Sequence, residues 1–459
     1  MAGIGFELQR VLREGRVLAF LKVTIAGAVI VAGPWLLSIL GIFTITRVAG
    51  SALSEASRLF TATIGYSFAT SLILFGGMQY EFTRHVADLI YEERFSDACG
   101  VMVAYLGLTT LAAVAIGVGA LAQMEMAVVS RPVLFKAALV GLFVAINLIW
   151  LLMIFASLLK RYVLVFAVYL VGMAGSTLGV IWLGGRLQLG GAMLGFAGGQ
   201  LSIALTLLLL IRIEYRPSFA AVRQIGGYFR RQRVLFFTGL LYNWGIWADK
   251  VVLWFTRGEA VEGTIIRTFD SYDIPFFFAN LTMIPGLIYF VIQAETNFYR
   301  ELMGFLDKLG GDPLRMLRQR KASMVRVLRM ELSSQMLLQG VCTAAVVFFA
   351  AEIARALFGG AVEAGVLQTT TVAVLAHLGL LTVLIFLFYL EEYGYALLAA
   401  TIFLALNVAG AFATLAWGVS AWRISYLLSA ALAGAFGAVV LFARLRVFDR
   451  VIFARSASG

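Results

Sequence analysis

Charged residues are scarce in this chain: only 13% of its 459 residues are Asp, Glu, Lys or Arg. Globular domains contain about 25% charged residues and about 45–50% apolar ones. Here 61% of the residues are hydrophobic and the mean hydropathy is +0.93. This composition excludes a soluble enzyme and a disordered chain, and it is typical of a polytopic membrane protein.

Cysteine and histidine are also rare, with two residues of each type. Cys99 and Cys342 lie far apart and form no CxxC pair, so neither a zinc site nor a disulfide framework is indicated. The motifs GxxxxGK[ST], HExxH and GxSxG are missing, which argues against an ATP-driven pump and the common hydrolases. The sequence also lacks a DxD pair, which disfavours a glycosyltransferase. We expect no catalytic residue, no metal and no cofactor.

Twelve apolar segments are long enough to cross a bilayer as helices, which takes about 20 residues each. They are 19–44, 59–79, 98–122, 135–159, 162–185, 189–211, 235–256, 275–295, 333–354, 365–390, 393–418 and 422–443. If both termini are cytoplasmic, 26 of the 36 Lys and Arg residues lie on the inner side and 10 on the outer side. This bias predicts an even number of spans with both termini inside.

The basic loop 212–234 separates six spans from six and contains six arginines. We therefore expect an all-α protein of two six-helix bundles, an arrangement common among transporters. The predicted parts are an amphipathic segment 1–18, a first bundle 19–211, the basic linker 212–234, a second bundle 235–443 and a cytoplasmic tail 444–459. The net charge of +11 then reflects loops that contact anionic membrane lipids, and no nucleic acid partner is expected.

Two predicted spans contain helix breakers. Gly33 and Pro34 lie near the middle of the first span, and Pro285 lies in the eighth. Proline removes a backbone hydrogen bond, and inside a membrane the freed carbonyl must face protein or a water-filled cavity. These positions are either hinges that line a cavity or static kinks, and both readings are open.

The seventh span, 235–256, contains the ionisable residues Asp249 and Lys250. Such residues are costly inside a membrane and usually mark a pathway or a pair. Because the two are adjacent, they are expected to point about 100° apart and not to share one face. One helical face instead combines Lys250 with Asn243, Trp247 and Trp254. This face suits a sugar passage, although Lys250 and Trp254 could also belong to the outer aromatic belt.

The eighth span adds Asn280 in its outer half and Glu295 at its cytoplasmic end. We expect Glu295 to be solvated or paired with an arginine such as Arg300, with a gate as the alternative role. The following loop, 296–332, is rich in basic residues, and it either anchors the protein on anionic lipid or docks a cytoplasmic protein.

Several strings give the chain a family resemblance: MAGIGFELQRVL at its start, AGPWLLSILG in the first span, NWGIWADKVVLW, YDIPFFFANLTMIPG and ETNFYREL. They resemble the PelG family, the inner-membrane transporter of the Pel exopolysaccharide machinery, which belongs to the multidrug/oligosaccharidyl-lipid/polysaccharide flippase superfamily. The resemblance covers nearly the whole chain. In related flippases the seventh span often bears an acidic residue that faces the cavity, and Asp249 matches that position.

The resemblance implies two six-helix bundles around a central cavity and export of a galactosaminoglycan-like polysaccharide across the bacterial inner membrane. It also implies a complex with a PelF-like cytoplasmic glycosyltransferase, a PelD-like receptor for cyclic-di-GMP and a PelE-like protein. Other functions stay open: a flippase for lipid-linked oligosaccharide, a cation-coupled exporter, or a membrane scaffold that holds a glycosyltransferase without transporting anything.

Overall fold

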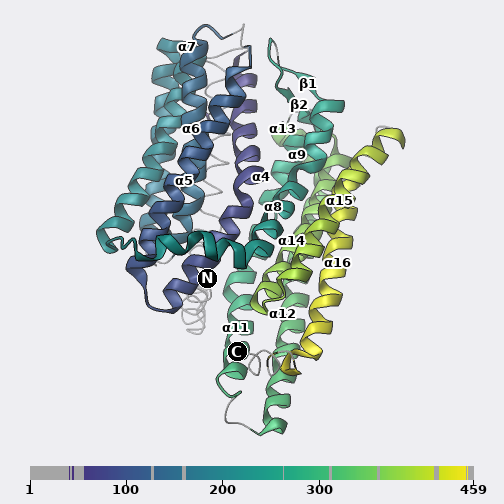
Figure 1. Ribbon diagram of the computed structural model, residues 1–459. Coiled ribbons are helices and arrows are strands. Elements are labelled where there is room, and N and C mark those ends of the chain that lie inside the picture. The colour runs from purple at the N-terminus through teal and green to yellow at the C-terminus, as the bar shows by residue number, and fades with distance from the viewer. Residues whose placement is uncertain are drawn as a thin grey trace. The chain divides into compact units, whose positions relative to one another are not determined.

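The computed structural model is almost entirely helical (Figure 1). It describes residues 41, 44–45, 56–125, 129–157, 162–261, 263–309, 313–358, 362–417, 423–450 and 452. The segment 1–18 and the first predicted span, with Gly33 and Pro34, therefore lie outside the described residues, apart from positions 41 and 44 at the end of that span. The chain divides into two compact units, which we call the N-terminal unit (33–269) and the C-terminal unit (270–459 with 1–32).

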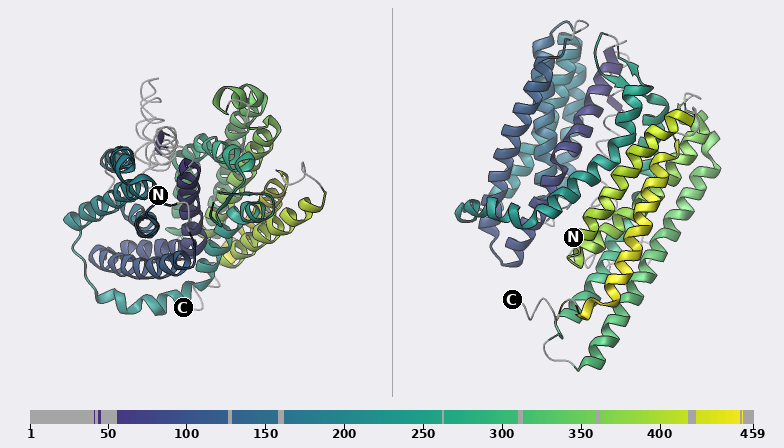
Figure 2. Two further views of the ribbon diagram at one scale, coloured as in Figure 1. Left: turned by 90° about the horizontal axis from the view of Figure 1, so that it is seen from above. Right: turned by 45° about the vertical axis from the view of Figure 1, so that its right-hand side comes forward.

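The described part of the N-terminal unit contains five long helices and a small hairpin. The helices are α4 (Ala56–Tyr91), α5 (Phe95–Ala122), α6 (Pro132–Ala156), α7 (Tyr162–Glu214) and α8 (Ile225–Thr256), with a short 3-10 helix η1 (Ala220–Gln224) before α8. Strands β1 (Glu259–Ala260) and β2 (Arg267–Thr268) pair antiparallel, with Glu259 opposite Thr268. Helices α5, α6 and α7 lie side by side in the blue and teal part of Figures 1 and 2.

The C-terminal unit begins with a broken helix and continues with longer ones. The broken part is α9 (Asp270–Leu281), α10 (Ile284–Tyr289), the π-helix η2 (Phe290–Ala294) and α11 (Glu295–Leu306). It is followed by α12 (Leu314–Phe348), α13 (Ala350–Phe358), α14 (Ala364–Tyr389), α15 (Tyr393–Trp417) and α16 (Ser425–Arg446). Helix α16 packs against both α14 and α15, as the yellow and light green ribbons of Figure 2 show.

Each predicted span from the second to the twelfth falls on helical residues, although the eighth covers the broken run from α9 to the start of α11. Helix α8, which contains the seventh predicted span, is not among the described helices that are long and apolar enough to cross a membrane, so that span stays a prediction. In the part of the chain that is described, nine helices are long and apolar enough to cross a membrane, and one of them, α7, covers two predicted spans. Their outer faces are apolar as well: Leu111 of α5 is 73% exposed and Val439 of α16 is 71% exposed. Exposed leucine and valine on charge-poor helices indicate contact with lipid. The protein is a polytopic all-α membrane protein.

Helix α7 folds back on itself. Its 53 residues would extend about 80 Å if straight, but Gln188 has non-helical angles (φ 55°, ψ −142°) that reverse the chain. The two arms approach closely through small residues: a Cβ on Gly195 would lie 2.2 Å from the carbonyl carbon of Gly179, and one on Gly199 would lie 2.0 Å from Ser176 Oγ. Gly195 and Gly199, four residues apart, thus allow the two arms to pack closely.

The units divide after Phe269, so α8 belongs to the N-terminal unit, where it packs against α4. The linker predicted at 212–234 lies one helix earlier in the chain. The bounds of the two six-helix bundles and of the linker between them stay a prediction.

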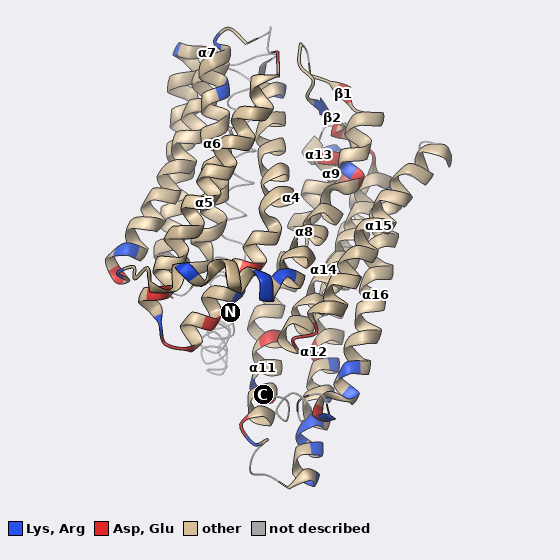
Figure 3. Cartoon of the chain, viewed as in Figure 1, with Lys and Arg blue, Asp and Glu red and all other residues tan. Residues whose placement is uncertain are grey.

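Basic residues gather at one end of the C-terminal unit, at the lower ends of α12 and α16 in Figure 3. Lys321 of α12 forms an ion pair with Asp449 at 2.8 Å, and Arg444 of α16 pairs with Glu392 at 2.9 Å. Partial burial alone would raise the pKa of Asp449, but the hydrogen bond and the positive charge of Lys321 outweigh it and hold that pKa below its usual value.

The packing of the α7 arms yields a testable expectation. Gly195→Ala should lower the free energy of unfolding by about 1–3 kcal/mol, because the added methyl collides with the backbone of the other arm. Gly198→Ala is the matched control: its Cβ meets no atom within 4 Å, and alanine favours the helix by about 1 kcal/mol. Thermal unfolding of the detergent-purified protein measures both, and equal melting temperatures for the two variants would contradict the packing.

Candidate functional site

Helix α8 places the two ionisable residues of the seventh predicted span in the protein interior. The side chains of Asp249 and Lys250 are 1% and 2% exposed. Lys250 Nζ lies 3.3 Å from Asp249 Oδ1 and donates a hydrogen bond to the backbone carbonyl of Ile246 at 2.9 Å. The two residues therefore form a buried ion pair within one helix.

The pair forms even though the two adjacent residues were expected to point about 100° apart and not to share one face. Their Cβ atoms do diverge by about 100°, but the lysine side chain is long enough to bend back by one turn. The Nζ atom of Lys250 contacts the carbonyl of Ile246, four residues earlier, which shows that the side chain bends toward the start of the helix. Pairing lowers the cost of burying each charge, since an isolated charge in a low-dielectric interior costs several kcal/mol.

Aromatic rings surround the ion pair. The ammonium of Lys250 lies 5.8 Å from the centre of the Trp247 ring, and Trp247 contacts Trp254 at 6.1 Å between centroids. Tyr66 of α4 stacks on Trp254 at 4.5 Å. Ala69 and Ile73 of α4 complete the cluster. The helical face that was predicted to combine polar and aromatic side chains is therefore buried against α4.

Asn243 lies further along this face and is also buried. Its side-chain amide donates to the carbonyl of Gly239 at 2.8 Å. A Cβ on Gly76 of α4 would lie 2.3 Å from its Nδ2 atom, so only glycine fits opposite it. The close approach of α4 and α8 thus depends on Gly76.

The far end of this helix pair is joined by polar contacts to the hairpin. Arg58 of α4 binds Glu259 of β1 at 3.0 Å and the hydroxyl of Thr268 in β2 at 3.2 Å. The hydroxyl of Tyr66 donates to the carbonyl of Arg267 at 2.8 Å. These bonds hold the chain that follows α8 against the start of α4.

In the C-terminal unit, the helix break falls just before Pro285. Helix α9 ends at Leu281, and Pro285 stands in the first turn of α10, where proline costs no hydrogen bond. Asn280 lies next to this break, and its amide donates to the carbonyl of Phe276 at 2.8 Å. Whether the break acts as a hinge stays a prediction.

Two glutamines of α12 bond the backbone at this break, and the sequence analysis missed them. Gln339 accepts a hydrogen bond from the Gly286 N–H at 3.1 Å and donates to the Thr282 carbonyl at 2.7 Å. Gln335 donates to the Gly286 carbonyl at 3.2 Å. Inside a membrane these backbone groups cannot be satisfied by water, so the glutamine side chains take its place.

The same face of α12 continues with Glu331, which is buried. It accepts hydrogen bonds from the hydroxyl of Tyr289 at 2.7 Å and from the amide of Asn297 at 2.6 Å. The signal was available in the sequence: Glu331, Gln335 and Gln339 follow one another at intervals of four, which places three polar side chains on one helical face.

Glu295 is buried, with 3% of its surface exposed. The hydroxyl of Tyr389 in α14 donates to its Oε1 atom, and among the described residues Glu295 forms no ion pair. The expectation of a solvated carboxylate or of a pair with Arg300 is therefore wrong, because Glu295 is buried and its hydrogen-bond donor is Tyr389 of α14.

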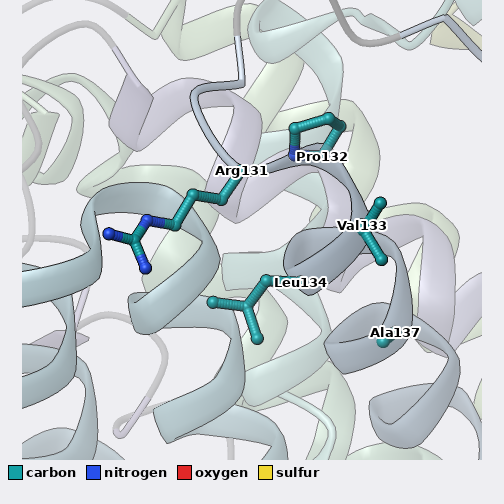
Figure 4. Close-up of a pocket in the computed structure, with 5 residues that line it drawn as sticks. All are labelled: Arg131, Pro132, Val133, Leu134 and Ala137. Atoms are coloured by element: carbon teal, nitrogen blue, oxygen red, sulfur yellow. The ribbon is translucent and has the colours of Figure 1, made fainter.

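No set of three or more His, Cys, Asp or Glu residues close enough to hold a metal occurs within the described ranges. Figure 4 shows a surface pocket at the start of α6. Its lining is Arg131, Pro132, Val133, Leu134 and Ala137, which is one arginine among apolar side chains. The polar groups that could serve a function are those of α4, α8 and the broken helix.

Comparison with solved structures defines the class of the fold. A MOP superfamily transporter from Pyrococcus furiosus matches with a TM-score of 0.61 and 13% sequence identity, covering 93% of this chain and 96% of that one. The Vibrio cholerae MATE transporter VcmN in the bent form gives 0.60 and 11%, covering 92% and 98%. The lipid II flippase MurJ in an inward closed conformation gives 0.56 and 16%, covering 91% and 87%. The fold is that of a MOP superfamily transporter.

The sequence itself places the chain within that class. It matches the family described as "PelG: Putative exopolysaccharide Exporter (EPS-E)" over residues 1–453. The chain belongs to the PelG family. A search of curated proteins gives no match.

The buried ion pair makes a stability prediction. Asp249→Asn or Lys250→Met alone should each lower the free energy of unfolding by about 3–5 kcal/mol, because each leaves one buried charge without its partner. The double variant should regain most of that loss. The control pair, Arg355 with Glu352, is 75% and 59% exposed, and its removal should cost at most about 1 kcal/mol. A double-mutant cycle on melting temperatures checks this, and strictly additive losses would contradict the pair.

Proposed function

We propose that this protein exports an exopolysaccharide, a Pel-like galactosaminoglycan, from the cytoplasm to the periplasm across the bacterial inner membrane. The observation that carries the proposal is the match to the exopolysaccharide exporter family over residues 1–453. The transporter fold supports it, since its solved relatives cover more than nine tenths of this chain.

In this proposal the protein is a transporter and not an enzyme, so the polymer is made by a partner. A PelF-like cytoplasmic glycosyltransferase would supply it, in a complex with a PelD-like receptor for cyclic-di-GMP and a PelE-like membrane protein. The exposed arginines of α12, among them Arg318 and Arg326, offer a surface for such contacts or for anionic lipid.

The proposed pathway residues are Asp249, Lys250, Asn243, Trp247, Asn280 and Glu295. Aromatic faces stack on the apolar faces of sugars, and amides and charges bond their hydroxyls. The four members of this set on α8 are buried, and Trp247 packs against Ala69 and Ile73 of α4. Contact with a polymer therefore requires α8 to move relative to α4, a helix shift of the kind that switching proteins use.

The export test uses cells that synthesise the polymer but lack their own exporter. Introducing this protein should restore polymer outside the cytoplasm. A lectin that binds the polymer, applied to intact and to permeabilised cells, measures its location. Synthesis with no export in cells that contain the protein at normal abundance would overturn the proposal.

The same assay separates a pathway role of the ion pair from a structural one. The double variant Asp249→Asn with Lys250→Met removes both charges and should remain folded. If the pair lies on the pathway, export should fall about tenfold or more at normal membrane abundance. Export at the wild-type level would assign the pair to packing of α8 alone.

A further inference from the structure

A buried glutamate of the N-terminal unit has an incomplete set of partners. Glu81 of α4 is 1% exposed. The hydroxyl of Tyr105 in α5 donates to its Oε2 atom, while its Oε1 atom is buried without any hydrogen-bond partner in the described part of the chain. One oxygen of this carboxyl thus accepts a hydrogen bond, and the other has no partner among the described residues.

A buried histidine lies one helical turn further along α4. His85 is 3% exposed, and its ring meets the edge of Tyr105 at 6.3 Å between centroids. It also stacks on Tyr228 of α8 at 3.9 Å. Its Nδ1 atom is buried and, among the described residues, has no hydrogen-bond partner. A buried acid and a buried base therefore contact the same tyrosine.

Ionisable groups continue from this point to the end of the helix. The hydroxyl of Tyr228 donates to Asp88, and Asp88 pairs with Arg84 at 3.0 Å, with 35% of its side chain exposed. Glu81, His85 and Asp88 stand at intervals of four and three, which places them on one face of α4. These three residues thus form a row from the buried carboxyl of Glu81 to the carboxyl of Asp88, which contacts solvent.

The C-terminal unit repeats the carboxyl–tyrosine arrangement. Glu295 accepts a hydrogen bond from Tyr389 at Oε1, and its Oε2 atom is buried with no partner among the described residues. Tyr299 lies beside Tyr389, with 6.2 Å between ring centroids, and Phe298 and Phe386 provide the apolar surroundings. In both units one tyrosine on a neighbouring helix holds one glutamate oxygen.

The two glutamates also occupy corresponding places in the sequence. Glu81 lies two residues after the end of the second predicted span, 59–79, and Glu295 ends the eighth, 275–295, which is the second span of the second half. Both positions fall on the side that the distribution of basic residues assigns to the cytoplasm.

The surroundings of both carboxyls favour reversible protonation over a permanent charge. An ionised carboxylate in a protein interior costs several kcal/mol unless a cation pairs with it, and within the described ranges neither glutamate lies within 4.0 Å of a Lys or Arg nitrogen. A neutral carboxylic acid accepts the tyrosine bond at one oxygen and carries its proton on the other. The proton count of such a group can therefore change when a conformational change alters its contact with water.

The titratable and charged groups around each carboxyl come from several helices. Those around Glu81 are His85, Asp88 and Arg84 on α4, Tyr105 on α5, Tyr228 and Arg231 on α8, and Arg94 in the α4–α5 loop. Those around Glu295 are Tyr389 on α14 and Tyr299 on α11.

We propose that Glu81 and Glu295 are proton-binding sites, one in each unit, that gain and lose a proton during the export cycle. The proposal rests on the proposed function, because it names the ion whose movement accompanies export. Binding adds one proton to one carboxylate, and release returns it to water. At Glu81 the release route passes His85 and ends at Asp88.

The direct test measures protonation without any polymer. Infrared difference spectra of the purified protein in lipid bilayers, recorded across a pH step, should contain a carboxylic acid band that shifts in heavy water. Glu81→Gln and Glu295→Gln should each remove part of this band, and the double variant should remove most of it. The exposed controls Glu92→Gln and Glu352→Gln should leave it unchanged.

A second pair of variants keeps the test decisive if a glutamine variant fails to fold. Tyr105→Phe and Tyr389→Phe each remove a single hydroxyl donor and should change the frequency of the same band, since the strength of that hydrogen bond sets it. A band that is absent from the wild type, or unaltered in all four site variants, would overturn the proposal.

Export measurements distinguish failure of this proposal from failure of the proposed function. In vesicles with an imposed pH gradient, each glutamine variant should export polymer about tenfold more slowly than the wild type. Wild-type export by the double variant would refute the proton sites and leave the exporter intact. Absence of export by the wild type would refute the exporter, while the infrared bands would still decide the proton sites.

Discussion

Inside a hydrocarbon layer every polar group must find its partner within the protein, and the structure described above follows from that requirement. Helices satisfy their own backbone, which explains why almost the whole described chain is helical. Where a helix breaks inside the membrane, side chains must replace the lost bonds. The break before Pro285 shows this directly, because Gln335 and Gln339 bond the backbone of Gly286 and Thr282.

The same requirement governs the charged side chains. Asp249 and Lys250 neutralise one another inside α8, so the helix can enter an apolar layer with no net charge from this pair. Glu81 and Glu295 are different, since each has a tyrosine hydroxyl as its only described hydrogen-bond partner. A buried carboxyl with a single neutral donor is stable only if it can hold a proton. The ion pair suits a fixed structural element, and the two carboxyls suit groups whose charge changes.

The sequence predicted the helices well because each span is a long apolar run, and a run of about 20 apolar residues is typical of a membrane-spanning helix. It failed where one side chain meets another that is distant along the chain. Tyr389, which bonds Glu295, lies 94 positions away, and nothing local to Glu295 reveals it. For Asp249 and Lys250 the helical angle between adjacent residues was correct, but the reach of the lysine decided the contact. The polar face of α12 could be predicted from the spacing of Glu331, Gln335 and Gln339. It was overlooked because the spans were defined by their apolar content alone.

The central claim is that this chain conducts a polysaccharide across the membrane. Inside-out vesicles that contain the protein and the polymer synthase, supplied with UDP-sugars, test it most directly. If this protein exports the polymer, polymer should be protected inside the vesicles from an added glycanase only when this protein is present. Polymer made in equal amount but fully digested by the enzyme would contradict it and would leave the protein as a membrane scaffold for the synthase.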